Sequence, residues 1–174
     1  DDNESIVEIM LGGNLSGQIT ERRIKSSQLI ADICPGSSHS TIFARTVTQA
    51  VQKFSFDKAS NEWKLVKEQV LMAGEVDPMI KSSSGCICLG PARRIFTSCV
   101  QTKSKMFVLM LNGVTLKEID RTCILTSEQK PLQYKGNYLS HICWLKTKRY
   151  QFILSLFRDS TVMVLSVAAR KLAI

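Results

Sequence analysis

Histidine is scarce in this chain, which has two histidines in 174 residues, His39 and His141. A Ser-His-Asp site would have to use one of them, and neither is accompanied by the Gly-x-Ser-x-Gly turn that carries such a nucleophile. The glycine patterns of phosphate-binding loops, Gly-x-x-x-x-Gly-Lys-Ser/Thr and Gly-x-Gly-x-x-Gly, are missing as well. We therefore expect no enzymatic activity and no cofactor.

Long apolar runs and a basic leader are also missing. No stretch approaches the roughly 18 uncharged apolar residues of a membrane span, and the chain opens on Asp1, Asp2, Asn3 and Glu4 instead of basic residues. Two glycosylation sequons, at Asn3 and Asn14, favour secretion instead. We expect an intracellular protein, nuclear or cytoplasmic, with no membrane contact.

Charge and hydropathy are those of a folded protein with a basic surface. Hydrophobic residues make up 44% of the chain and charged residues 22%, which is enough apolar material to fill a core. Lysine and arginine exceed aspartate and glutamate by 23 to 15, a net charge of +8. Such a surface favours acidic partners, either proteins or nucleic acids.

Three stretches share one pattern, an apolar strand that ends in cysteine, a polar turn, and a second apolar strand entered through phenylalanine. The stretches are Ile30 to Cys34 with Phe43, Ile95 to Cys99 with Phe107, and Leu139 to Cys143 with Phe152, so the cysteine-to-phenylalanine gaps are nine, eight and nine residues. Repetition of this kind is typical of solenoids and propellers, whose units stack on their neighbours. The pattern predicts an all-β fold of propeller-like blades, each of four antiparallel strands.

Turn residues set the expected boundaries. Within the first blade the expected strands are Leu29 to Cys34, Thr41 to Thr46, Val51 to Phe56 and Trp63 to Leu71. Asn112-Gly113 between two apolar runs predicts a hairpin with a type I′ turn. We expect a single β-rich domain or domain fragment with an outer-strand hairpin (1–27), a blade (28–71), an inserted loop rich in Gly, Pro and Ser (72–94), a blade (95–137) and a partial blade (138–174).

By strand order and spacing, residues 28 to 167 resemble the WD40-like β-propellers. The Gly-His and Trp-Asp dipeptides of that family are absent, so the chain is more similar to the divergent propellers of large scaffold proteins, such as the damaged-DNA-binding and cleavage-factor large subunits. Closed propellers have about four or more blades. The resemblance therefore implies an incomplete ring, completed by a protein partner or by a further segment of chain.

A second resemblance is kept as the alternative fold. Phe54-Ser55-Phe56-Asp57, followed by Glu62-Trp63-Lys64, is similar to the early hairpin of pleckstrin-like domains of the Ran-binding type. This reading implies a β-barrel closed by a C-terminal helix over Asp159 to Ile174, and an adaptor function. The β-branched residues Val162, Val164 and Val167 favour a strand in that segment.

Six cysteines raise the questions of disulfides and of metal. Because Cys34, Cys99 and Cys143 take matching positions in the repeat, we predict that they are buried and reduced. The candidate ligands for a zinc ion are Cys86, Cys88, His141 and Cys143. Paired zinc ligands usually stand about two to four residues apart, whereas one residue separates each of these pairs. We therefore predict no metal site.

Basic turns are the predicted partner-binding site. If each turn joins the first and second strands of a blade, two such turns place one set of cations side by side on one face, namely Lys103, Lys105, Lys146, Lys148 and Arg149. Arg22, Arg23, Arg93 and Arg94 are further candidates. The sequence thus predicts a non-enzymatic protein–protein interaction scaffold module within a larger intracellular assembly. A nucleic-acid-contacting subunit that uses the same turns is the alternative.

Overall fold

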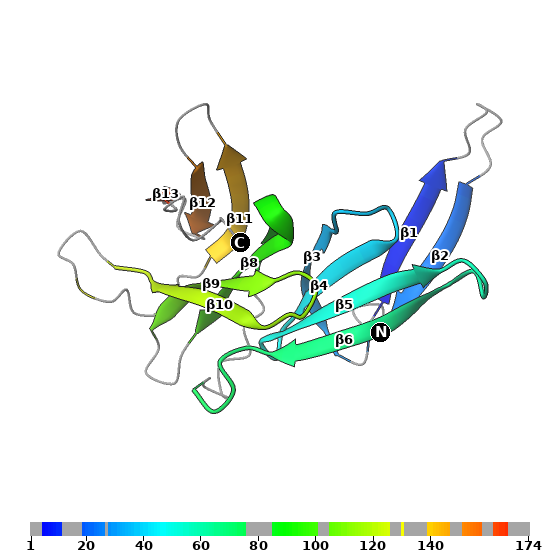
Figure 1. Cartoon of the computed structure of the whole chain (residues 1–174), viewed down its shortest axis with the longest axis horizontal. Coiled ribbons are helices and arrows are strands. Elements are labelled where there is room, and N and C mark those ends of the chain that lie inside the picture. Colours follow the sequence, from blue (N-terminus) through cyan, green and yellow to red (C-terminus); the bar gives the residue numbers. More distant parts are fainter. Residues whose placement is uncertain are drawn as a thin grey trace.

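A computed structural model describes residues 5–11, 19–26, 28–75, 85–100, 105–125, 130, 139–146, 151–157 and 162–166. Within these ranges the regular structure is almost entirely β (Figure 1), and the one helical piece is a 3-10 turn, η2 (Pro91–Arg93). None of the described segments forms a helix with the length and apolarity needed to cross a membrane. The predicted all-β class is confirmed.

The strands form one hairpin and three antiparallel sheets. The N-terminal hairpin pairs β1 with β2, sheet 1 has the order β3-β4-β5-β6, sheet 2 has β7-β8-β9-β10, and sheet 3 has β11-β12-β13. The described sheets close into no barrel. Their bounds are β1 (Ser5–Leu11), β2 (Ile19–Lys25), β3 (Ile30–Pro35), β4 (Thr41–Thr46), β5 (Ala50–Asp57), β6 (Glu62–Val70), β7 (Ile87–Leu89), β8 (Arg94–Val100), β9 (Met106–Asn112), β10 (Glu118–Cys123), β11 (Leu139–Lys146), β12 (Gln151–Phe157) and β13 (Val162–Ser166).

Sheet 1 forms from the four segments that the sequence predicts, and its blade-like meander is confirmed. Polar turns separate its strands, and side chains of these turns can form hydrogen bonds with the backbone of the turn itself. In the β5–β6 turn, Asp57 accepts hydrogen bonds from the Ala59 amide and the Ser60 hydroxyl, and Asn61 takes the left-handed conformation, with φ of 57°. Lys64 pairs with Asp57 at 2.5 Å and closes this hairpin.

Sheet 2 starts earlier than predicted. The expected loop from 72 to 94 contains β7, which pairs antiparallel with β8, and η2. This strand has three residues, Ile87, Cys88 and Leu89, and lies between Gly85 and the Gly90-Pro91 pair. It is too short to show the alternating pattern that predicts a strand. The unit expected from residue 95 therefore begins at Ile87 in the structure.

The β9–β10 hairpin is present, but its turn differs from the predicted two-residue type I′ turn. Asn112 ends β9, and its side-chain oxygen accepts hydrogen bonds from the amides of Val114 (2.8 Å) and Thr115 (3.0 Å). Leu116, with φ of 58°, supplies the left-handed residue, and β10 begins at Glu118. The asparagine side chain thus organises a longer loop instead of entering the turn itself.

The cysteine-to-phenylalanine repeat aligns strands that are not equivalent. Cys34 faces Phe43 across strands β3 and β4, the first and second of sheet 1, whereas Cys99 faces Phe107 across β8 and β9, the second and third of sheet 2. In sheet 3, Cys143 faces Leu154 instead of Phe152. The spacing therefore reflects similar hairpins at shifted places, because β7 adds a strand before the second copy.

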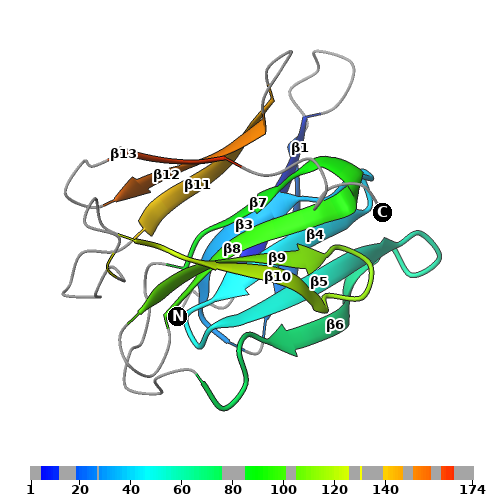
Figure 2. The same cartoon turned by 60° about the vertical axis from the view of Figure 1, so that its left-hand side comes forward.

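Sheet 2 lies between sheets 1 and 3, with β3 against β7 and β7 against β11 (Figure 2). All seven residues of β8 are buried because both of its faces are covered. One face meets the core shared with sheet 1, to which Phe43, Ile95 and Leu109 contribute. The other face meets sheet 3, where Phe96 stacks on Trp144 with ring centroids 5.2 Å apart.

Polar side chains of sheet 1 join its backbone to that of sheet 2. Asp32 accepts a hydrogen bond from the Ile87 amide at 2.9 Å. The fully buried Arg45 donates to the Ser98 carbonyl from Nε and Nη2, at 3.3 and 3.1 Å, and from Nη1 to the Thr46 carbonyl. Burial lowers the pKa of Arg45 to about 10. These hydrogen bonds hold sheets 1 and 2 against each other along the surface where the two sheets meet.

Two further expectations are corrected. β13 occupies the segment in which the pleckstrin-like alternative places its closing helix, so that alternative is wrong. In this segment the preference of the β-branched residues for strands outweighs the residues that could cap a helix. The six cysteines all have free thiols, and Cys34 and Cys99 are buried as predicted, but Cys143 is exposed, because its face of β11 points away from sheet 2.

Candidate functional site

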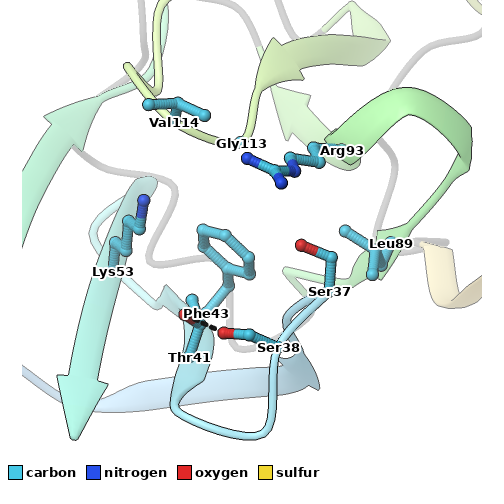
Figure 3. Close-up of a pocket in the computed structure, with 9 residues that line it drawn as sticks. All are labelled: Ser37, Ser38, Thr41, Phe43, Lys53, Leu89, Arg93, Gly113 and Val114. Atoms are coloured by element: carbon cyan, nitrogen blue, oxygen red, sulfur yellow. Dashed lines mark hydrogen bonds between the residues drawn. The ribbon is translucent and has the colours of Figure 1, made fainter.

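A pocket of about 230 Å³ opens where sheets 1 and 2 meet (Figure 3). The β3–β4 turn forms one side of it, β5 a second side, and η2 with the β9–β10 loop the third. The lining residues are Ser37, Ser38, Thr41, Phe43, Lys53, Leu89, Arg93, Gly113 and Val114.

The β3–β4 turn supplies hydroxyl groups. The Gly36 amide donates to the Thr41 carbonyl at 2.8 Å, and the Thr41 amide donates to the Ser38 carbonyl at 3.1 Å, so the turn is closed by its own backbone. The Ser38 and Thr41 hydroxyls share a hydrogen bond of 2.9 Å, drawn in Figure 3. The turn thereby presents short polar side chains at fixed positions beside the pocket.

Lys53 is held in place by an aromatic ring. It is the cross-strand partner of Phe43, and its Nζ lies 5.9 Å from the centroid of that ring. A cation over a ring face is stabilised by about 0.5–1 kcal/mol at an exposed site. Because Phe43 is buried in the core between the sheets, the ring anchors the ammonium group at the pocket.

Arg93 reaches the pocket through an unusual backbone. Ala92 and Arg93 both take left-handed conformations, with φ of 50° and 56°, a strain of about 1–3 kcal/mol for each such residue. The Gly113 amide donates to the Arg93 carbonyl at 2.8 Å, and a Cβ at Gly113 would collide with that carbonyl oxygen. Glycine at 113 and the strained turn together place the Arg93 guanidinium opposite Phe43 (Figure 3).

The chemistry of the lining suits binding. Its two ionisable groups are both cations, and the nine lining residues include no carboxylate, imidazole or thiol. Within the described residues, neither Lys53 nor Arg93 forms an ion pair with a carboxylate. Two cations without counter-charges, next to hydroxyl donors, form a site for an anion. The same lining provides no acid–base pair for catalysis.

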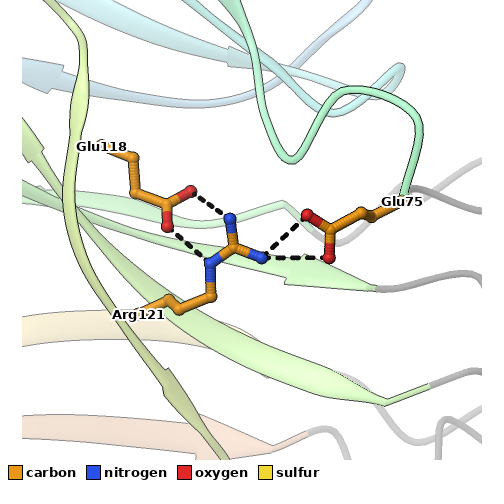
Figure 4. A network of polar contacts seen from close by, with 3 residues as sticks. All are labelled: Glu75, Glu118 and Arg121. Atoms are coloured by element: carbon orange, nitrogen blue, oxygen red, sulfur yellow. Dashed lines mark hydrogen bonds and ion pairs between the residues drawn. The ribbon is translucent and has the colours of Figure 1, made fainter.

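A second opening between sheets 1 and 2, of about 210 Å³, has a lining arginine that is already paired with carboxylates. There Arg121 on β10 pairs with Glu118 on its own strand (Nε to Oε1, 2.5 Å) and with Glu75 of the turn after β6 (Nη1 to Oε2, 3.1 Å), as Figure 4 shows. Hydrogen bonds to these carboxylates raise the pKa of Arg121. Exposed pairs of this kind contribute about 0–1 kcal/mol each. This arginine links the two sheets, and its charge is neutralised.

Most of the predicted basic patch lies outside the described residues. This applies to Lys103, Lys148 and Arg149, while Lys146 ends β11 and Lys105, next to β9, is partly buried. The shared patch on these turns therefore stays a prediction.

The candidate zinc ligands are split between core and surface. Cys86 and Cys88 are buried, and burial raises the pKa of the Cys86 thiol to about 11. His141 and Cys143 are exposed on β11. No group of three or more His, Cys, Asp or Glu side chains suited to a metal ion occurs in the described part of the chain.

No protein-family model matches the sequence, and no curated protein matches it. Among solved structures, the chain is similar to the dihydro-heme d1 dehydrogenase NirN in complex with DHE, at 9% sequence identity and a TM-score of 0.45. The match covers 99% of this chain and 46% of that protein's chain. The chain thus spans about half the length of the solved protein, and its function has to be inferred from its own residues.

Proposed function

We propose that this chain is a non-enzymatic protein–protein interaction module, a divergent WD40-like blade array, that binds an acidic segment of a protein partner in the pocket between sheets 1 and 2. The observation that carries the proposal is the pair of cations, Lys53 and Arg93, fixed on opposite sides of a hydroxyl-lined pocket. The module acts in a larger intracellular assembly, nuclear or cytoplasmic.

The buried thiols support a binding role over catalysis. Burial raises the pKa of Cys34 to about 12 and that of Cys99 to about 11, so these thiols stay protonated and weakly nucleophilic near neutral pH. Each of them packs in the core between sheets 1 and 2. Their role is therefore to fill space between the sheets.

Sheet 3 supports the idea that a partner or a further segment of chain continues the array. Ile142 and Trp144 of β11 face sheet 2, whereas the alternate residues His141, Cys143 and Leu145 are exposed. Sheet 2, by contrast, is covered on both faces. A neighbouring blade would cover β11 in the same way.

Binding of a short glutamate-rich peptide labelled with fluorescein tests the proposal. We expect saturable binding by fluorescence anisotropy that weakens as salt is added. The double variant Lys53→Gln/Arg93→Gln should bind at least about tenfold more weakly, because charge-assisted hydrogen bonds contribute about 1.5–3 kcal/mol each. The matched control is Lys58→Gln/Lys117→Gln, which removes the same charge from exposed positions outside the pocket. Equal affinities for the two double variants would contradict the proposal.

Nucleic acid is the alternative partner, favoured by the net charge of +8. Under this alternative, changing all five predicted patch residues to glutamine should abolish binding of a duplex or single-stranded oligonucleotide and leave the fold intact. The patch residues are Lys103, Lys105, Lys146, Lys148 and Arg149. Anisotropy over a series of salt concentrations measures the effect, since phosphate contacts give affinity a steep salt dependence. Binding that survives the five changes would exclude this patch as the site.

A further inference from the structure

We propose that the pocket between sheets 1 and 2 recognises a phosphorylated serine or threonine side chain of the partner. This inference rests on the proposed function and names the chemical group that Lys53 and Arg93 hold. It follows from three properties of the pocket, namely its charge, its hydrogen-bond donors and its size.

The charge of the pocket matches a dianion. Lys53 and Arg93 contribute two positive charges, and no residue of the lining contributes a negative one. A phosphate monoester carries a charge of about −1.5 to −2 at neutral pH, whereas a glutamate or aspartate side chain carries one negative charge. A carboxylate would leave about one cation of the pocket without a counter-charge. A phosphate monoester neutralises both.

The donors of the pocket match the acceptors of a phosphate group. A guanidinium offers a fork of N–H groups that binds two phosphate oxygens at once, and an ammonium offers up to three donors. Ser37, Ser38 and Thr41 add hydroxyls. The Ser38 hydroxyl is shared between those of Thr41 (2.9 Å) and Ser40 (3.3 Å), and a hydroxyl can rotate to donate to a ligand instead. Three phosphate oxygens therefore have donors on several sides.

The pocket has room for one such group and its attachment. Its volume is about 230 Å³, and Phe43, Leu89 and Val114 give it apolar walls next to the cations. These walls suit the methylene or methyl carbons of a phosphoserine or phosphothreonine. A nucleic-acid phosphate, in contrast, is a diester with a single charge and a sugar on each side, and so it matches neither the charge nor the enclosure.

Three fluorescein-labelled peptide pools test the inference. The pools share degenerate flanks and differ at the central residue, which is phosphoserine, glutamate or serine. We expect the phosphoserine pool to bind at least about tenfold more tightly than the glutamate pool, because its charge is about double. The serine pool should bind most weakly. Inorganic phosphate should compete with the phosphoserine pool.

Variants connect this preference to the pocket. Lys53→Gln and Arg93→Gln should each reduce the preference for phosphoserine over glutamate, whereas Lys58→Gln, an exposed lysine outside the pocket, should leave it unchanged. Circular dichroism verifies that each variant is folded. Equal binding of the phosphoserine and glutamate pools would overturn this inference and leave the proposed function standing. Failure of both pools to bind would overturn both this inference and the proposed function. Displacement of the phosphoserine pool by an oligonucleotide without terminal phosphates would overturn this inference and assign the pocket to phosphodiesters.

Discussion

Replacing Gln49 with leucine is expected to lower the free energy of unfolding by about 3 kcal/mol. Gln49 lies in the β4–β5 turn, 1% exposed, and its side-chain amide bonds both backbone groups of Val100: Oε1 accepts from the amide at 2.8 Å, and Nε2 donates to the carbonyl at 3.3 Å. Leucine has a similar size but leaves both groups of β8 without these bonds. Each buried polar group that loses its partner costs about 1–3 kcal/mol.

Urea denaturation measures this effect, with Gln69→Leu as the matched control. Gln69 lies on the outer strand β6, and its side chain bonds the adjacent Val70 carbonyl in an exposed setting. We expect that control to change stability by less than about 0.5 kcal/mol. If the two variants unfold at the same urea concentration, the Gln49 amide does not join sheets 1 and 2.

Raising the pH from about 8 to about 10 is expected to lower the free energy of unfolding by about 5 kcal/mol through four buried thiols. Burial raises the pKa of Cys34 to about 12, and that of Cys86 and Cys99 to about 11, from an ordinary value of 9.0. Burial raises the pKa of Cys88 as well. In the unfolded chain these thiols lose their protons near pH 9. The stability they confer is therefore complete below pH 9 and is lost as the pH rises toward 11 and 12.

Arg45 acts in the opposite direction at higher pH. Burial lowers its pKa from 12.5 to about 10, so the folded protein releases this proton before the unfolded chain does. Stability consequently gains from Arg45 as the pH rises from about 10 to 12.5. The fall caused by the thiols is for this reason clearest between about pH 8 and pH 10, and the slope should lessen above that range.

Cysteine-to-alanine variants separate the thiols from the lysines and tyrosines that also titrate in this range. Cys34→Ala alone should remove about one quarter of the pH-dependent loss, and Cys34→Ala/Cys86→Ala/Cys88→Ala/Cys99→Ala should remove nearly all of it. The measured quantity is the difference in urea midpoint between the two pH values, which is insensitive to the lower overall stability of each variant. A loss of the same size in the single variant and the parent protein would show that Cys34 is not responsible.

The sequence was most informative about sheet 1 and least about where units begin. Strands of six to nine residues, such as β4 and β6, lie between polar turns and can be predicted from their composition. β7 has three residues, and nothing local distinguishes it from the loop around it. Because the sequence does not predict β7, the predicted second unit begins one strand late. The cysteine-to-phenylalanine spacing therefore aligns β3, a first strand, with β8, a second strand.

The candidate site was largely beyond reach of the sequence because it is assembled across sheets. Arg93 was among the further basic candidates, but Lys53 is one of many lysines, and its nearness to Arg93 depends on the packing of sheet 1 against sheet 2. That packing is set by Asp32, Arg45 and Gln49, whose partners are backbone atoms about 50 residues away. The local signal of the turn that carries Arg93 is Gly90-Pro91, which predicts a loop but not the left-handed backbone of Ala92 and Arg93.

Backbone amide chemical-shift mapping with the phosphoserine peptide pool tests the central claim most directly. That claim is that an acidic partner binds in the pocket between sheets 1 and 2. We expect saturable shifts concentrated at Ser38, Thr41, Arg93 and Gly113, and we expect them to disappear in the Lys53→Gln/Arg93→Gln variant. Shifts concentrated instead in residues 101–105 and 146–150, and unchanged in that variant, would contradict the claim and assign binding to the basic turns.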